Sequence, residues 1–312
     1  MALFYQIFSS LGVVAFLGAC ATAQTVTAET PDVPGWLEKD YSELVNLFEG
    51  RWDSDRHVFF AEDAGMDMSE IAPRQHIEIE RMPAEGDAPD LAQFEATRTV
   101  EGEAPSTLQH TFSIDATRNV ILQAMAITSE AGEQVSLDCS VDWRRQGAQF
   151  QGIAYGEGCD DLFPRPDAVG DLSVSMSLSE TEYWVSAQRG EAIVEARLRR
   201  ARAFECWTAI LRGASHGDSG EGMRDWDFRR GVRLHDQGGE AELITDEETP
   251  RRIRLRLRNV DWPYGTNRPS LTLYIMEGDS DRAVSYAWNE GDAERIGLNL
   301  RWLQASCTHT PE

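Results

Sequence analysis

Lysine is nearly absent from this chain, since Lys39 is the only lysine among 29 basic residues. A Schiff-base mechanism would therefore have a single candidate, in a polar leader segment, and we discard it. The basic side chains are outnumbered by 53 acidic ones, which gives a formal net charge of -24. Such a chain repels phosphate backbones and anionic membrane surfaces, so nucleic-acid binding is not expected.

Several sequence patterns of known chemistry are also missing. The six histidines and five cysteines show no H-x-x-x-H or C-x-x-C spacing, so a structural zinc site has no support. No glycine-rich phosphate loop is present, and no alternation of strands and helices indicates a doubly wound sheet. Gly213–Gly217 matches G-x-S-x-G, but no helical pattern follows Ser215, and a flexible loop is the better interpretation.

The N-terminus has an apolar run, but one too short for a membrane-spanning helix. Leu11–Gly18 leads into Cys20 through L-G-A-C, which has the form of a lipobox. We expect residues 1–20 to be a signal peptide with Cys20 as the lipidation site, and residues 21–35 to be a polar tether. The expected location is periplasmic or on the outer membrane, with membrane contact only through the lipid. Cleavage after Ala21–Ala23 and a buried N-terminal helix are the alternatives.

Four further cysteines remain, which is an even number suited to an oxidising compartment: Cys139, Cys159, Cys206 and Cys307. Four cysteines allow three pairings. We favour a Cys139–Cys159 disulfide, which would join adjacent strands. A Cys206–Cys307 disulfide would then hold the C-terminal strand to the middle of the chain. Four buried free thiols are the alternative.

Alternation of apolar and polar residues dominates the chain after one N-terminal helix. That helix is expected over Trp36–Glu49, and Gly50 would end it. The clearest alternating runs are His76–Glu80, Val135–Trp143, Leu172–Leu178, Ile253–Arg258, a hairpin of Leu271–Ile275 with Val284–Trp288, and a last strand over Ile296–Trp302. Short alternating runs between Gly, Asp and Pro turns predict an all-β protein with antiparallel sandwich or barrel architecture.

A Gly/Ser-rich stretch over Gly213–Gly222 suggests a division of the chain. We place the barrel over residues 36–212 and a C-terminal β-strand region over residues 223–312. A hairpin extension of one continuous barrel is the alternative. Eight tryptophans lie on predicted strands, where they either fill the core or line an apolar ligand cavity.

One stretch has a more specific pattern. Its ordered pieces are Leu137-Asp138-Cys139, Trp143, Phe150-x-Gly152, Gly156-x-Gly158-Cys159 and Leu178-x-Glu180, preceded by Leu47-x-x-Gly50-x-Trp52 and His76-Ile77-x-Ile79-x-Arg81-x-Pro83. In order and spacing this pattern resembles the CpcT/CpeT chromophore-lyase family. The resemblance covers residues 42–206, roughly half of the chain.

The resemblance implies a lipocalin-like antiparallel β-barrel with the remaining residues as a C-terminal β extension. It also implies an activity, which is attachment of a linear tetrapyrrole (bilin) to a cysteine of an acceptor phycobiliprotein. The barrel would hold this amphipathic ligand and present it to the acceptor protein. No catalytic residue is identified. The candidate ligand-binding residues are Glu95, Arg98, Gln109, Trp143 and Tyr155.

Two functions therefore remain open. The first is a chromophore-lyase-like protein that binds a bilin-type or similar amphipathic ligand and attaches it to a protein cysteine. The second is a non-enzymatic envelope lipoprotein that binds a lipid or pigment, or serves as a structural module. A cavity lined by Glu95, Arg98, Trp143 and Tyr155 would favour ligand binding, whereas an interior filled by side chains would favour a structural role.

Overall fold

The computed structural model describes residues 32–83, 91–128, 134–164, 166–213, 225–261 and 268–311. Val33–Glu312 form one compact unit. Strands make up most of the described residues, and ten of them close into an antiparallel barrel. The prediction of an all-β protein with an antiparallel barrel and a C-terminal β extension is confirmed. No helix in the described ranges has the length and apolar character needed to cross a membrane.

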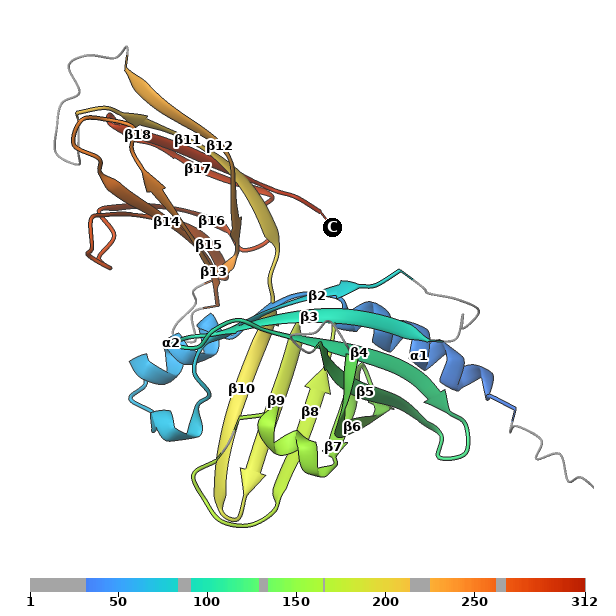
Figure 1. The fold of residues 1–312 in the computed structure, drawn as a ribbon. Coiled ribbons are helices and arrows are strands. Elements are labelled where there is room, and N and C mark those ends of the chain that lie inside the picture. Colours follow the sequence, from blue (N-terminus) through green and yellow to red (C-terminus); the bar gives the residue numbers. More distant parts are fainter. Residues whose placement is uncertain are drawn as a thin grey trace, which may run out of the picture. The chain divides into compact units, whose positions relative to one another are not determined.

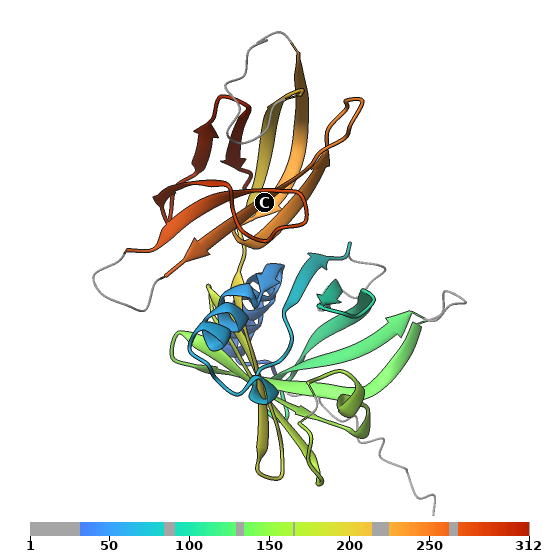
Figure 2. The ribbon, with the colours of Figure 1, turned by 90° about the vertical axis from the view of Figure 1, so that its left-hand side faces the viewer.

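The barrel is a meander in which each strand pairs with its neighbours in the chain, and β1 closes it by pairing with β10 and β2 (Figures 1 and 2). Its strands are β1 (Gly50–Asp53), β2 (Gln75–Arg81), β3 (Ala92–Val100), β4 (Ser106–Asp115), β5 (Val120–Thr128), β6 (Gln134–Gln146), β7 (Gln149–Tyr155), β8 (Leu172–Leu178), β9 (Glu182–Arg189) and β10 (Ala192–Arg200). Alternate side chains form one apolar core inside it. The period of two in the sequence is therefore the inside–outside alternation of a barrel.

Helix α1 (Gly35–Phe48) packs at one end of the barrel. The Tyr41 hydroxyl accepts a hydrogen bond from the Ala92 N–H (2.8 Å) and donates one to the Phe112 carbonyl (3.2 Å). At the end of the helix, the Phe48 ring makes edge contacts with the rings of Phe94 and Phe112. The predicted helix over Trp36–Glu49 is confirmed, and its apolar face closes this end of the barrel core.

The C-terminal end of α1 is held by an arginine of the last barrel strand. The Arg200 guanidinium donates to the carbonyls of Leu47 and Glu49, which have no partner within the helix. The same guanidinium stacks over the ring of Trp52 at 4.2 Å. Arg200 thus joins helix α1, strand β1 and strand β10 at the point where the barrel closes.

The other end of the barrel carries the 3-10 helix η2 (Glu157–Asp161) between β7 and β8. The disulfide Cys139–Cys159 is confirmed, but it joins β6 to η2 and not to an adjacent strand. Asp160 of η2 forms a salt bridge with Arg189 of β9 (2.5 Å). Gly156 enters η2 at a φ of 114°, where a Cβ atom would lie 2.1 Å from the Asp138 carbonyl oxygen.

Besides η2, two short helices were not predicted from the sequence, namely α2 (Asp55–Asp63) and the 3-10 helix η1 (Met68–Glu70). Helix α2 buries only Asp55 and Ala61. It therefore lacks the apolar spacing that reveals an amphipathic helix in a sequence.

The C-terminal part is a β-sandwich. Its sheets have the orders β12-β11-β18-β17 and β13-β14-β15-β16. The strands are β11 (Ala203–Leu211), β12 (Trp226–His235), β13 (Gln237–Ile244), β14 (Arg252–Val260), β15 (Ser270–Glu277), β16 (Ser285–Glu290), β17 (Arg295–Asn299) and β18 (Leu303–His309). One buried apolar cluster contains residues of both sheets. The disulfide Cys206–Cys307 is confirmed and links paired residues of β11 and β18.

The structure places two boundaries differently from the sequence. Strand β11 lies within the range assigned to the barrel, yet it pairs with β12 and β18, so the barrel ends at Arg200. The expected last strand is interrupted by a turn in which the Leu300 N–H bonds to the Leu303 carbonyl (2.7 Å), and β18 follows it. Cys20, the signal peptide, most of the tether and Ser215 lie outside the described residues.

Candidate functional site

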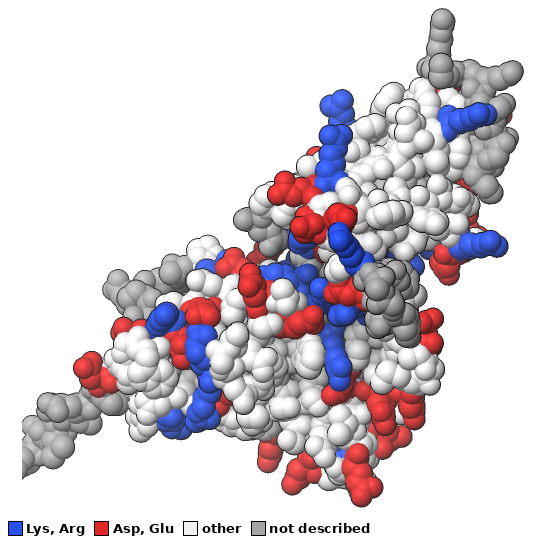
Figure 3. Space-filling view, turned by 180° about the vertical axis from the view of Figure 1, so that it is seen from behind, with Lys and Arg blue, Asp and Glu red and all other residues white. Residues whose placement is uncertain are grey.

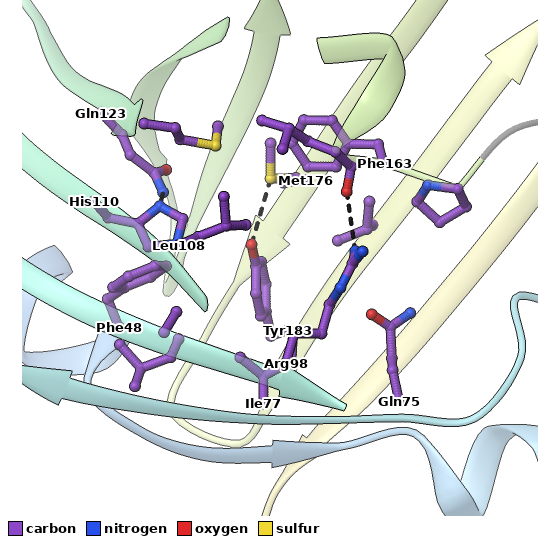
Figure 4. A pocket seen from close by; sticks show the side chains of 16 residues that line it. Phe48, Gln75, Ile77, Arg98, Leu108, His110, Gln123, Phe163, Met176 and Tyr183 are labelled. Carbon is purple, nitrogen blue, oxygen red and sulfur yellow. Dashed lines mark hydrogen bonds between the residues drawn. The ribbon is translucent and has the colours of Figure 1, made fainter. Parts of the chain in front are cut away.

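A pocket lies inside the barrel near the end that carries η2 (Figure 4). Its walls come from α1, from strands β2 to β5, β8 and β9, and from the residues after η2. The lining residues are Phe48, Gln75, Ile77, Ile79, Ala96, Arg98, Leu108, His110, Gln123, Met125, Leu162, Phe163, Pro164, Met176, Tyr183 and Val185. Most of these are apolar, and a few polar groups converge on the space between them, which is the usual composition of a small-molecule site.

Arg98 is the charged side chain of this pocket. It follows Phe94 and Ala96 on the inward face of β3. Its Nη1 donates to the Leu162 carbonyl (3.0 Å), and its Nε is buried with no hydrogen-bond partner among the described residues. Among the described residues, those that line the pocket include no Asp or Glu. The guanidinium therefore stands in an apolar space without a carboxylate to balance its charge.

A buried polar chain crosses the neighbouring strands. The Trp143 Nε1–H donates to Gln123 Oε1 (2.7 Å), and Gln123 Nε2 lies 2.8 Å from His110 Nδ1. Burial lowers the pKa of His110 to about 4, so its imidazole is neutral near pH 7. The amide group of Gln123 then donates to Nδ1, and the His110 proton is left on Nε2.

Tyr183 supplies a second neutral group from β9. Its hydroxyl donates to Met176 Sδ at 3.5 Å. Burial raises the pKa of this phenol, so it stays protonated at physiological pH. Together with His110 and Gln75, it offers hydrogen bonds without adding charge to the pocket.

The segment Glu157–Pro164, called the strap below, covers the pocket. Leu162, Phe163 and Pro164 supply part of its wall (Figure 4). The cavity measures about 60 Å³ and is partly open to solvent. Drug-sized ligands occupy pockets of roughly 300–1,000 Å³. The pocket in this structure is therefore too small for such a ligand, and its strap is held by the Cys139–Cys159 disulfide and by the Arg98 hydrogen bond.

The structure separates the five predicted ligand-binding residues. Arg98 lines the pocket. Trp143 is fully buried and reaches the pocket only through its bond to Gln123. Glu95 and Gln109 are paired neighbours on the outer face of β3 and β4, and Tyr155 is 44% exposed beneath the Arg118 guanidinium. The cavity expected from Glu95, Arg98, Trp143 and Tyr155 together is therefore not formed.

Sequence reasoning missed His110, Gln123, Gln75 and Tyr183 as pocket residues. A signal for two of them was present, because His110 and Gln123 occupy inward positions between apolar residues on alternating strands. The strap has no comparable signal, since η2 follows no periodic pattern.

A second cluster of chemically capable side chains consists of Asp53, His76 and His235. In the described ranges it is the group whose potential metal-ligand atoms all lie within 4.8 Å. Arg74 donates to both carboxylate oxygens of Asp53 (3.1 Å each), and the Asp55 N–H donates to one of them (2.7 Å). The two imidazole rings are stacked at 4.4 Å with planes 15° apart, so their in-plane lone pairs do not converge on one ion. The arrangement fits an ion-pair network better than a metal centre.

The charges of this network follow from burial and contacts. Burial would raise the pKa of Asp53, but hydrogen bonds from His76 and Arg74 hold it below its usual value. Burial would lower the pKa of His76, but the carboxylates of Asp53 and Glu78 raise it to about 9. Burial lowers the pKa of His235 to about 4. Near pH 7 the stack therefore joins one charged ring to one neutral ring.

Two comparisons with known proteins bear on the family of this chain. A scan against protein-family models found no match, and a search of curated proteins found no matching sequence.

Proposed function

We propose that this chain is a ligand-binding protein whose barrel holds an amphipathic molecule in the pocket beneath the strap. The observation that carries this proposal is the composition of that pocket: apolar walls surround Arg98, Gln75, His110 and Tyr183 in an interior that side chains do not completely fill. A purely structural barrel gains nothing from an inward arginine without an acidic partner, because burying an unpaired charge costs free energy.

A bilin is the ligand class that the resemblance to the chromophore-lyase family implies. Several of the residues that carry this resemblance have architectural roles in the barrel. Cys139 and Cys159 form a disulfide, and a Cβ atom on Gly152 would lie 3.0 Å from the Trp143 ring. These roles support a shared barrel, and a shared binding step is what the resemblance implies in addition. Attachment of the ligand to a cysteine of an acceptor protein is the further step that the resemblance implies.

The second candidate is a non-enzymatic envelope lipoprotein that binds a lipid or another pigment. The small cavity volume of about 60 Å³ favours it, because a tetrapyrrole needs several times that volume. A small or slender ligand could enter with a modest displacement of the strap, whereas a bilin requires the strap to move away.

We further propose that the chain is exported and lipidated at Cys20. Two disulfides support export, since disulfides persist in oxidising compartments. The lipid would then provide the membrane contact. On the face shown in Figure 3, basic side chains lie among acidic ones. This mixed surface gives no reason to include a nucleic acid among the proposed partners.

Titration of the purified protein separates these candidates. Biliverdin and phycocyanobilin are added separately while the visible spectrum is recorded, and a neutral apolar fluorophore is titrated in parallel. A saturable, shifted and sharpened bilin band would support a bilin carrier, whose transfer to an acceptor subunit can then be assayed. Binding of the fluorophore without a bilin response would favour the second candidate. No binding of either at micromolar concentrations would refute a ligand-binding barrel.

A further inference from the structure

The charge inside the barrel pocket restricts the chemical class of the ligand more than the volume of the pocket does. Arg98 supplies the positive charge of a guanidinium group. The other polar groups of the pocket are neutral, since Gln75 and Gln123 carry no charge and His110 and Tyr183 are uncharged near neutral pH. The lining residues that the structure describes thus carry one positive charge and no negative charge. A single negative charge on the ligand would balance it, whereas a dianion would leave a buried excess charge.

The donors of Arg98 are also incompletely used. In the part of the chain that the structure describes, its hydrogen bond goes to the neutral carbonyl of Leu162, and Nε is buried without an acceptor. A carboxylate can accept two parallel N–H bonds from one guanidinium, and such charge-assisted bonds are about twice as strong as neutral ones. A carboxylate that reached Arg98 would therefore compete well with the Leu162 carbonyl.

Leu162 belongs to the strap, so this competition has a structural consequence. The strap is anchored at its start by the Cys139–Cys159 disulfide and by the Asp160–Arg189 salt bridge. Its later part, Leu162–Pro164, lies over the pocket and is bound to the barrel wall through Arg98. Leu162 and Phe163 also pack against the barrel core. Loss of the Arg98 hydrogen bond would leave the covering residues held by this apolar packing, which the apolar part of a ligand can replace, while the anchored part stays in place.

We propose that the ligand is an amphipathic monocarboxylate, whose acid group pairs with Arg98 in place of the Leu162 carbonyl and so releases the strap from the pocket. This inference rests on the proposed ligand-binding function. It assigns the apolar part of the ligand to the space between Ile79, Met125 and Val185, and its acid group to the end beneath the strap.

The test compares an acid with the matching alcohol. A neutral apolar fluorophore is bound first, and its displacement by decanoate or by decanol is measured. The assay is run on the unaltered protein, on Arg98→Gln and on a control, Arg144→Gln, which changes an exposed arginine on the outer surface of β6. We expect decanoate to bind roughly tenfold tighter than decanol, or more, in the unaltered protein and in the control. In Arg98→Gln this preference should disappear while decanol binding remains.

The outcomes distinguish this inference from the proposed function. Equal affinity for acid and alcohol in the unaltered protein overturns the inference but leaves a barrel that binds apolar molecules. Failure of the fluorophore and both ligands to bind overturns the proposed function as well. The comparison in the unaltered protein needs no variant, so it stands even if Arg98→Gln fails to fold.

Hydrogen exchange tests the strap directly. The N–H groups of Cys159, Leu162 and Phe163 form hydrogen bonds within the strap region and serve as reporters. We expect faster exchange at Leu162 and Phe163 with decanoate than with decanol, and slow exchange at Cys159 with both. Equal protection of all three amides with both ligands would refute release of the strap.

Discussion

Replacement of Gln123 by leucine tests the polar chain that supports the pocket wall. Gln123 is 1% exposed and bonds both Trp143 Nε1 and His110 Nδ1. Leucine has a similar volume, so the main change is a buried N–H and a buried ring nitrogen left without partners. Each such group costs about 1–3 kcal/mol, and some of this is offset by the apolar side chain. We expect a loss of about 2–4 kcal/mol in the free energy of unfolding of the barrel.

Urea unfolding followed by far-UV circular dichroism, with the disulfides intact, measures this loss. The double variant His110→Leu/Gln123→Leu removes both partners of the bond between the Gln123 amide and His110 Nδ1, so neither of these two groups is left unpaired. Its loss should therefore be smaller than the sum of the two single losses by about 1 kcal/mol. A loss below about 0.5 kcal/mol for Gln123→Leu, or strict additivity in the double variant, would refute the reasoning.

Three other predictions concern the His76 ion pairs, the start of η2 and the second disulfide. Because contacts with two carboxylates raise the pKa of His76 from 6.5 to about 9, its stabilising contribution is complete below pH 6.5 and is lost as pH rises through 9. The stability difference between the unaltered protein and His76→Gln, measured by urea unfolding, should shrink over that interval, and a constant difference would contradict it. Gly156→Ala should destabilise the barrel and loosen η2, because its Cβ would lie 2.1 Å from the Asp138 carbonyl oxygen; unchanged proteolysis of η2 would argue against this. Replacing both Cys206 and Cys307 with alanine opens a loop with a sequence separation of 101. We expect the free energy of unfolding of the sandwich, measured by calorimetry, to fall by about 2–5 kcal/mol. An unchanged melting temperature would count against this prediction.

Much of the architecture could be predicted because alternation in the sequence maps directly onto a barrel wall. The runs at His76–Glu80 and Leu172–Leu178 became β2 and β8, and the apolar spacing of Trp36–Glu49 became α1. The assignment of β11 failed for a different reason. Its alternation identifies a strand but not the sheet that it joins, since pairing with β18 depends on a contact about 100 residues away.

The candidate site was predictable only in part. The inside–outside alternation along each strand would have excluded two of the predicted residues. Phe94, Ala96 and Arg98 share one face of β3, so Glu95 had to face outward once Phe94 faced the core. The same argument places Tyr155 outside, because Gly152 and Ala154 precede it on the inward side of β7. The strap could not be found this way, because its position depends on a disulfide and on one arginine–carbonyl bond.

The central claim is that the barrel pocket is a ligand site, and a pocket-filling variant tests it most directly. Ala96 lines the pocket, whereas Ala148 is an exposed alanine in the turn between β6 and β7. A neutral apolar fluorophore is titrated into the unaltered protein, Ala96→Leu and Ala148→Leu, with folding of each checked by circular dichroism. We predict saturable one-to-one binding that weakens at least about tenfold in Ala96→Leu alone, because the added carbons occupy most of the cavity. Equal binding by all three folded proteins would place the ligand elsewhere and contradict the account.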